Sequence, residues 1–296
     1  MIRFIGQIFG IGVVGFGIFL LLTSPKTVSQ DELAGLTGDP VHGEAVFWAA
    51  GCASCHAAED STGEARLILA GGQHFPSDFG TFIAPNISSD PDMGIGGWSL
   101  AEFVTAVQEG VSPSGQHYYP AFPYTAYNLA ERQDIVDLYA FMMTLPADAT
   151  PSQPHDIGFP FNIRRLTGGW KFLFMTDGYV IDGDLPEDQA RGRYLSEALA
   201  HCAECHTPRN ALGALDRAAW MQGAPNPSGE GRIPDITPAE LGWSQADIAN
   251  YLRDGFTPSF DAAGGHMRSV VQNLANLPDE DRMAVAAYLL ALPNAQ

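Results

Sequence analysis

The four cysteines of this 296-residue chain fall into two copies of one short motif, Cys-x-x-Cys-His. The copies are Cys52, Cys55 and His56, and Cys202, Cys205 and His206. Two thiols at this spacing can bond to the vinyl groups of a haem, and the adjacent imidazole can bind its iron. A zinc half-site or a dithiol redox pair also uses Cys-x-x-Cys, but neither requires the histidine that follows here twice. The motifs therefore predict two covalently bound haem c groups.

The sixth ligand of each iron sets its potential and its reactivity. In the second half of the chain the candidate is Met267, which lies 24 residues after Trp243. The same count from Trp98 leads to Phe122, whose side chain cannot bind iron. The two iron sites are therefore expected to differ.

Three arrangements stay open for the first iron. His117, five residues before Phe122, would give two imidazole ligands and a lower potential. Another side chain could bind instead, or the position could be open beneath the Phe122 ring. The other candidates are Met93, Met142, Met143 and His74. We favour His117, because imidazole is a common haem ligand.

The stretches that follow the two motifs resemble each other and predict the same helices. Ser99 with Glu102, and Ser244 with Asp247, are capping signatures of helices that should end at Gly110 and Gly255. Further helices are expected at 43–50 and 189–200, before the motifs, and at 129–145 and 279–292, at the ends of the copies. Since no stretch alternates with period two, sheet is not expected and the fold class is all-α.

The N-terminus carries an apolar stretch, residues 4–22, that is interrupted only by Gln7. It is long enough to span a bilayer, and no cleavage site follows it, so a transmembrane helix is preferred over a secretory signal. Arg3 ahead of it predicts export of the rest of the chain. The expected parts are residues 1–26 (anchor or signal peptide), 27–148 (first haem domain), 149–186 (connecting segment) and 187–296 (second haem domain). The aromatic residues of the connecting segment should pack between the domains.

The formal charge of −19 is spread along the chain rather than gathered in a tail. An acidic surface repels phosphate backbones, so nucleic acid is excluded as a partner. The charge either keeps the protein soluble or also steers a basic redox partner.

Together these residues make the chain similar to the cytochrome c subunits of membrane-bound bacterial alcohol, gluconate and related sugar dehydrogenases. The shared elements are Pro85-Asn86-Ile87, Gly96-Gly97-Trp98-Ser99, Tyr119-Pro120-Ala121-x-Pro123-Tyr124, Phe159-Pro160-Phe161-Asn162-Ile163-Arg164 and Glu204-Cys205-His206-Thr207-Pro208-Arg209-Asn210. The resemblance implies tandem class I cytochrome c-type domains that relay electrons beside a periplasmic or membrane-bound dehydrogenase. Family members typically carry three haem sites and a methionine where Phe122 stands, so this chain departs from the family twice.

The sequence therefore predicts single-electron transfer at the bacterial inner membrane, with the haem domains in the periplasm. The electrons would pass from a dehydrogenase to a soluble cytochrome, an oxidase or a quinone. A haem enzyme, such as a peroxidase or a sulfur-compound oxidase with an open or labile first haem, is the alternative. A ligand-sensing module has less support, because no signalling segment is visible. No other catalytic constellation stands out, which favours an electron-transfer subunit over an enzyme by itself.

Overall fold

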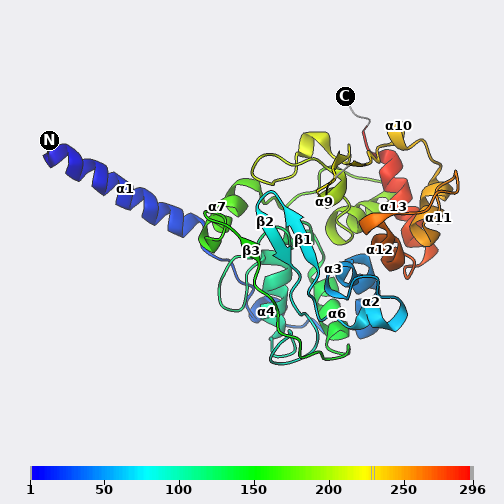
Figure 1. Ribbon diagram of the computed structural model, residues 1–296, viewed down its shortest axis with the longest axis horizontal. Coiled ribbons are helices and arrows are strands. Elements are labelled where there is room, and N and C mark those ends of the chain that lie inside the picture. The colour runs from blue at the N-terminus through cyan, green and yellow to red at the C-terminus, as the bar shows by residue number, and fades with distance from the viewer. Residues whose placement is uncertain (1, 228, 230, 294–296) are drawn as a thin grey trace.

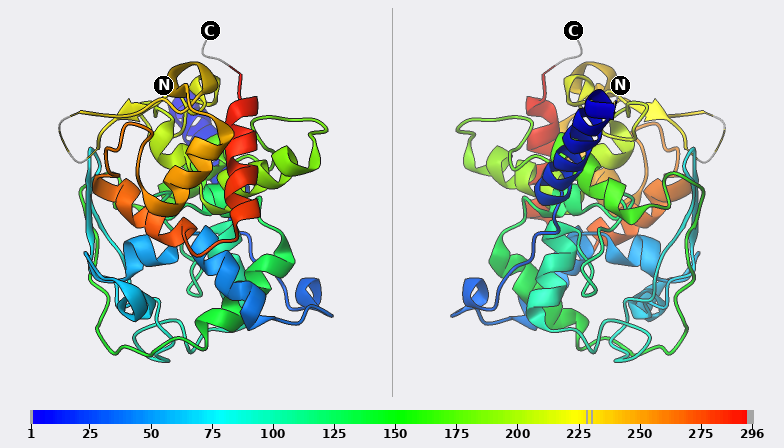
Figure 2. Two further views of the ribbon diagram at one scale, coloured as in Figure 1. Left: turned by 90° about the vertical axis from the view of Figure 1, so that its right-hand side faces the viewer. Right: turned by 90° about the vertical axis from the view of Figure 1, so that its left-hand side faces the viewer.

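The computed structural model describes residues 2–227, 229 and 231–293. Two helical domains follow each other along the chain, and a helix at the N-terminus projects from their body (Figure 1). Figure 2 shows the second domain, yellow to red, packed against the blue and cyan helices of the first. The side chain of Arg3, on which the expected orientation rests, lies outside the described residues.

The first domain and the helix ahead of it contain eleven elements of the described chain. They are α1 (Ile2–Leu22), η1 (Asp31–Leu33), α2 (Pro40–Ala49), α3 (Cys52–His56), η2 (Gly63–Leu67), β1 (His74–Ser77), β2 (Gly80–Ile83), α4 (Leu100–Val104), η3 (Thr105–Glu109), α5 (Tyr124–Tyr127) and α6 (Arg132–Met142), where η1 is a single turn. The connecting segment adds β3 (Asp156–Ile157) and α7 (Arg164–Phe174). The second domain comprises α8 (Glu187–Arg193), η4 (Tyr194–Leu199), α9 (Ala203–His206), η5 (Arg217–Ala219), β4 (Ala224–Pro225), β5 (Arg232–Ile233), α10 (Pro238–Leu241), α11 (Gln245–Asp254), α12 (Gly265–Leu274) and α13 (Asp279–Ala291).

The predicted helices are confirmed, and both capping signatures form. Ser99 Oγ accepts a hydrogen bond from the Glu102 amide at 3.3 Å, and the Glu102 carboxylate accepts one from the Ser99 amide at 2.7 Å. Ser244 and Asp247 make the same pair of bonds at 3.2 and 3.1 Å. These reciprocal bonds satisfy amide groups that the first turn of a helix leaves without partners.

Each domain is built on a close crossing of its first and last helices. Helix α2 packs against α6, and α8 packs against α13. A Cβ atom at Gly43 would lie 2.0 Å from the Asp137 carbonyl oxygen, and one at Gly192 would lie 1.9 Å from the Ala284 oxygen. Only glycine allows the backbones of these helices to approach so closely.

One buried apolar cluster runs through both domains, from Phe47 in α2 to Tyr288 in α13. Side-chain hydrogen bonds also cross the boundary: Tyr194 donates to Asp134, and Thr125 donates to Glu204 at 3.1 Å. The two domains therefore share a core rather than being joined only by a linker.

The connecting segment contacts both domains, although its aromatic residues are buried only in part. Lys171 in α7 donates to the Gly110 carbonyl of the first domain at 2.7 Å. Arg217 of the second domain donates to the Gly178 carbonyl at 2.9 Å. Phe159 and Phe172, however, are 81% and 62% exposed. The expectation that these aromatics are buried is therefore only partly met.

The expectation of no sheet is wrong. Strands β1 and β2 form an antiparallel hairpin in which His74 pairs with Ile83, and β3 pairs with the other edge of β2. Strands β4 and β5 form a second antiparallel pair. These strands are two to four residues long, too short for period two to be visible in the sequence.

Helix α1 forms where the apolar stretch predicts a helix, but the prediction that it spans a membrane is wrong. Among the residues that the structure describes, no helix is both long and apolar enough to cross a bilayer. The end of α1 contacts α7, where Arg165 donates a hydrogen bond to the Leu20 carbonyl.

We expect Gly43→Ala and Gly192→Ala each to lower the free energy of unfolding by about 1–3 kcal/mol, because the added methyl group must push two helices apart. Gly158→Ala is the control, since nothing lies within 4 Å of a Cβ atom there. Thermal denaturation followed by circular dichroism measures all three. Equal melting temperatures for the two helix variants and the control would contradict this account of the helix crossings.

Candidate functional site

The two Cys-x-x-Cys-His segments form short helices with the same histidine geometry. His56 Nδ1 lies 2.8 Å from the Pro85 carbonyl oxygen, and His206 Nδ1 lies 2.8 Å from the Pro234 carbonyl oxygen. Because a carbonyl oxygen only accepts hydrogen bonds, Nδ1 carries the proton in each ring and Nε2 keeps a free lone pair. Each imidazole is thus held in the tautomer that binds a metal through Nε2.

None of the four cysteines in these segments forms a disulfide. Burial raises the pKa of Cys52 and of Cys202 to about 12, and burial with the nearby Cys205 raises that of Cys55 to about 11. Two thiols followed directly by an imidazole whose Nε2 is free are the donor set that suits thioether bonds to a haem and ligation of its iron.

The two segments lie next to each other across the domain boundary. Gly51 precedes the first segment with a φ of +70°, and His201 precedes the second with a φ of +42°. A Cβ atom at Gly51 would lie 3.7 Å from His201 Cε1. Tyr127 contacts both sides, since its ring lies 5.6 Å from that of His201 and its hydroxyl donates to the Ala50 carbonyl at 2.7 Å. Sequence reasoning missed His201, because no motif marks it.

Met267, the candidate sixth ligand of the second site, lies in α12 and packs half-buried on the shared core. Its neighbour His266 is exposed, with its ring 6.1 Å from that of Phe75 in β1. Met267 therefore stays the prediction for the second iron.

At the equivalent place in the first domain, Phe122 lies among tyrosines. Its ring centroid is 5.8 Å from that of Tyr118 and 5.9 Å from that of Tyr127. The hydroxyl of Tyr127 in turn donates a hydrogen bond to the carbonyl of Ala50, the residue before Gly51. An aromatic cluster thus connects Phe122, which stands at the position equivalent to Met267, to the first haem segment.

His117 is buried between the end of α1 and α7. Its Nε2 lies 3.0 Å from the Thr23 carbonyl oxygen, and a Cβ atom at Gly168 would lie 2.6 Å from the same nitrogen. Burial and the nearby Lys171 lower its pKa. Iron ligation by His117 stays a prediction, and it would require this nitrogen to leave Thr23 or the ring to bind through Nδ1.

The other candidates for the first iron lie in unlike surroundings. Met142 is 2% exposed within α6, and Met143 packs on the same core. Met93 and His74 are exposed. None of these four has a described contact with the first haem segment.

A buried carboxylate distinguishes the second domain from the first. Glu197 lies five residues before Cys202, where the first domain has Phe47 five residues before Cys52. Both side chains are buried. Glu197 accepts hydrogen bonds from the Tyr288 hydroxyl and, at 2.8 Å, from the Val180 amide. Burial nevertheless raises its pKa above the ordinary 4.5.

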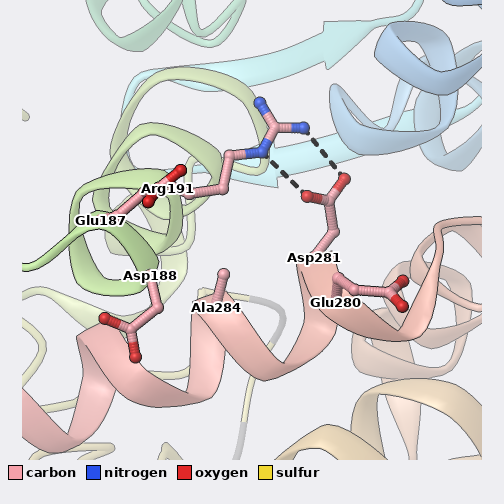
Figure 3. A pocket seen from close by; sticks show the side chains of 6 residues that line it. All are labelled: Glu187, Asp188, Arg191, Glu280, Asp281 and Ala284. Atoms are coloured by element: carbon pink, nitrogen blue, oxygen red, sulfur yellow. Dashed lines mark hydrogen bonds and ion pairs between the residues drawn. The ribbon is translucent and has the colours of Figure 1, made fainter.

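Two further groups of charged residues lie away from the cysteines. A surface hollow between α8 and α13 is lined by Glu187, Asp188, Arg191, Glu280, Asp281 and Ala284, and Figure 3 shows its arginine paired with Asp281. The other group, His42, Asp134 and Asp137, brings three ligand atoms within 4.8 Å of one another. Asp137 already accepts hydrogen bonds from the Asp39 amide, His42 and Gln133, so this group serves to join α2 to α6.

Comparison with known families supports the assignment of both domains. Residues 41–146 match the family model of cytochrome c, and residues 187–289 match that of cytochrome c oxidase, cbb3-type, subunit III. The fold and the site thus define a protein of two cytochrome c domains, a class that carries covalently bound haem c and transfers electrons.

Similar proteins narrow this class. The chain is 56% identical over 274 residues to a diheme cytochrome c-type protein of Cereibacter sphaeroides, a match that covers 93% of each chain. It is 40% identical to the fructose dehydrogenase cytochrome subunit of Gluconobacter japonicus, covering 83% of this chain and 51% of that subunit. It is 33% identical to the gluconate 2-dehydrogenase cytochrome c subunit of Pantoea cypripedii, and this match covers 84% of this chain and 58% of that subunit. The chain thus spans a little over half the length of these two dehydrogenase subunits.

The chain belongs to the family of diheme c-type cytochromes related to the cytochrome subunits of these dehydrogenases. The resemblance to sugar and alcohol dehydrogenase cytochromes that the sequence motifs indicated is therefore confirmed.

Glu197 should make stability depend on pH in a defined direction. Because its pKa is raised on folding, its contribution to stability is present below pH 4.5 and is lost as the pH rises through the folded-state value. Glu197→Gln should therefore gain stability over the wild type at neutral pH and lose that advantage below pH 4.5. Urea unfolding at a series of pH values measures this.

Asp247→Asn is the control with the opposite sign, since hydrogen bonds from Ser244 lower the pKa of Asp247. A pH profile of Glu197→Gln that runs parallel to that of the wild type would show that Glu197 titrates in the folded protein as it does in the unfolded chain.

Proposed function

We propose that the chain relays single electrons from a periplasmic dehydrogenase to a respiratory acceptor, through two haems. The haems would be attached at Cys52 and Cys55 and at Cys202 and Cys205. The acceptor would be a soluble cytochrome, an oxidase or a quinone. The observation that carries this proposal is the contact of the two attachment segments at Gly51 and His201.

Haem c, when bound, supplies an iron that alternates between the ferric and ferrous states. The protein would hold this iron through His56 in one domain and His206 in the other. The carbonyls of Pro85 and Pro234 fix these imidazoles in place, so the ligands would not reorient when the iron changes charge. Met267 would complete the second site and raise its potential.

The shared core supports relay within one molecule. Because the two attachment segments are packed together, an electron could cross from one site to the other without separation and renewed encounter of two proteins. Close packing also limits the rearrangement that a change of charge would cause. Two haems in one rigid body are therefore suited to connect a donor on one side to an acceptor on the other.

The class of donor is proposed from the relatives. Proteins 33–40% identical to this chain are named as cytochrome subunits of fructose and gluconate dehydrogenases. A dehydrogenase oxidises its substrate by two electrons, and a chain of haems would remove them one at a time. We also propose that the two domains act in the periplasm, because a secretory signal, the alternative interpretation of the N-terminal apolar stretch, directs export. The domain limits of 27–148, 149–186 and 187–296 remain part of this proposal.

The relay predicts a defined loss of haem and of electron transfer. Wild-type protein should carry two covalent haems, Cys52→Ser with Cys55→Ser only the second, and Cys202→Ser with Cys205→Ser only the first, as measured by intact-protein mass. In a complex purified with its native dehydrogenase, substrate should reduce both haems of the wild type, and soluble cytochrome c should reoxidise them. Each one-haem variant should lose most of this flux. Full haem content without any reduction by the dehydrogenase complex would contradict the relay.

Spectra of the ferric protein test the axial ligands and the haem-enzyme alternative. Two six-coordinate low-spin haems are expected in the wild type. Met267→Ala should remove the methionine–iron absorption, and His117→Ala should perturb the other haem only. A high-spin haem in the wild type that binds cyanide or turns over peroxide would favour a haem enzyme instead.

A further inference from the structure

Arg66 is a buried cation at the boundary between the two domains. It lies in η2 of the first domain and is 5% exposed. Its Nη2 donates to Asn273 Oδ1 at 2.5 Å and to the Ser269 carbonyl at 3.3 Å, both in α12 of the second domain. Its guanidinium lies 5.5 Å from the centre of the Trp48 ring. All of these partners are neutral.

Arg66 has no charged partner among the residues that the structure describes. Burial alone lowers its pKa, with no acidic group to offset it, yet a guanidinium stays protonated in proteins. Arg282, which is also 5% exposed, pairs with Asp279. A buried charge without a partner is costly, so the missing carboxylate at Arg66 calls for a reason.

The position of Arg66 connects it to both haem sites. Asn273, which accepts its hydrogen bond, donates from Nδ2 to Ser54 Oγ at 2.8 Å. Ser54 lies between Cys52 and Cys55, the attachment residues of the first haem. Helix α12, which carries Asn273, also carries Met267, the candidate ligand of the second iron. One amide side chain thus separates the cation from the first attachment helix.

We propose that the unpaired positive charge of Arg66 raises the reduction potentials of both haems. Reduction of each iron removes one positive charge from its site, so a nearby cation favours the ferrous state. Inside the protein this repulsion is screened less than in water. The inference rests on the proposed function, because it assumes haems at both attachment segments.

A redox titration of the intact two-haem protein, with chemical mediators and optical detection, tests this proposal. Arg66→Met removes the charge, and Asn273→Asp supplies the missing carboxylate while keeping the contact. Both variants should lower the two midpoint potentials. We expect each reduction equilibrium constant to fall about tenfold, which corresponds to a shift of about 59 mV for one electron. Arg66→Lys keeps the charge, and Asn273→Ala removes the contact alone, so both should stay near the wild type.

The same variants separate a redox role from a merely structural one. If Arg66 only joins the domains, Arg66→Met and Asn273→Ala will melt at lower temperature while the potentials of both variants stay at the wild-type values, and that result overturns the proposal. Should Arg66→Met fail to fold, Arg66→Gln against Arg66→Lys decides, because both side chains can donate hydrogen bonds and only lysine keeps the charge. Because the titration uses chemical mediators, it does not need the dehydrogenase. If the wild-type protein carried no covalent haem, that result would instead refute the proposed function.

Discussion

The contact between the two attachment segments constrains the arrangement of both domains. Gly51 and His201 hold the left-handed backbone conformation that begins each segment, and the His201 ring lies against Gly51. For the segments to meet, the helix pairs on either side must bring them to one boundary, which the close crossings at Gly43 and Gly192 allow. The result is one core instead of two, with the two attachment segments side by side at the domain boundary.

Within this arrangement the two sites share a framework but differ in their surroundings. Each histidine bonds a proline carbonyl at 2.8 Å, so the proximal geometry is the same. Elsewhere the copies diverge, with Phe122 for Met267 and Phe47 for Glu197. The differences lie at the candidate ligand position and before the attachment helix, where polarity and charge would affect a haem potential. Two unlike haem sites on adjacent attachment segments would suit the proposed relay between a donor and an acceptor.

Local sequence signals predicted much of the structure, and contacts between distant residues are what they missed. The cysteine spacing and the capping signatures of Ser99 and Ser244 involve neighbours in the chain, so they can be read directly. Arg66 and Asn273 are 207 residues apart, and nothing in either segment indicates their contact. No sequence motif marks His201, and its contact with Gly51 follows only from the fold. The prediction of a membrane span rested on the length and hydropathy of the N-terminal stretch, and among the described residues no helix is both long and apolar enough to cross a bilayer.

The central claim is that the two haem sites act as one unit, and the rate of electron exchange between them tests it most directly. A flash of photoreductant can deliver less than one electron per molecule, after which absorbance follows the redistribution between the haems. We expect a redistribution rate that does not depend on protein concentration, because the electron would move within a single core. A rate that rises in proportion to protein concentration would mean that the haems exchange electrons only when molecules collide, and would contradict it.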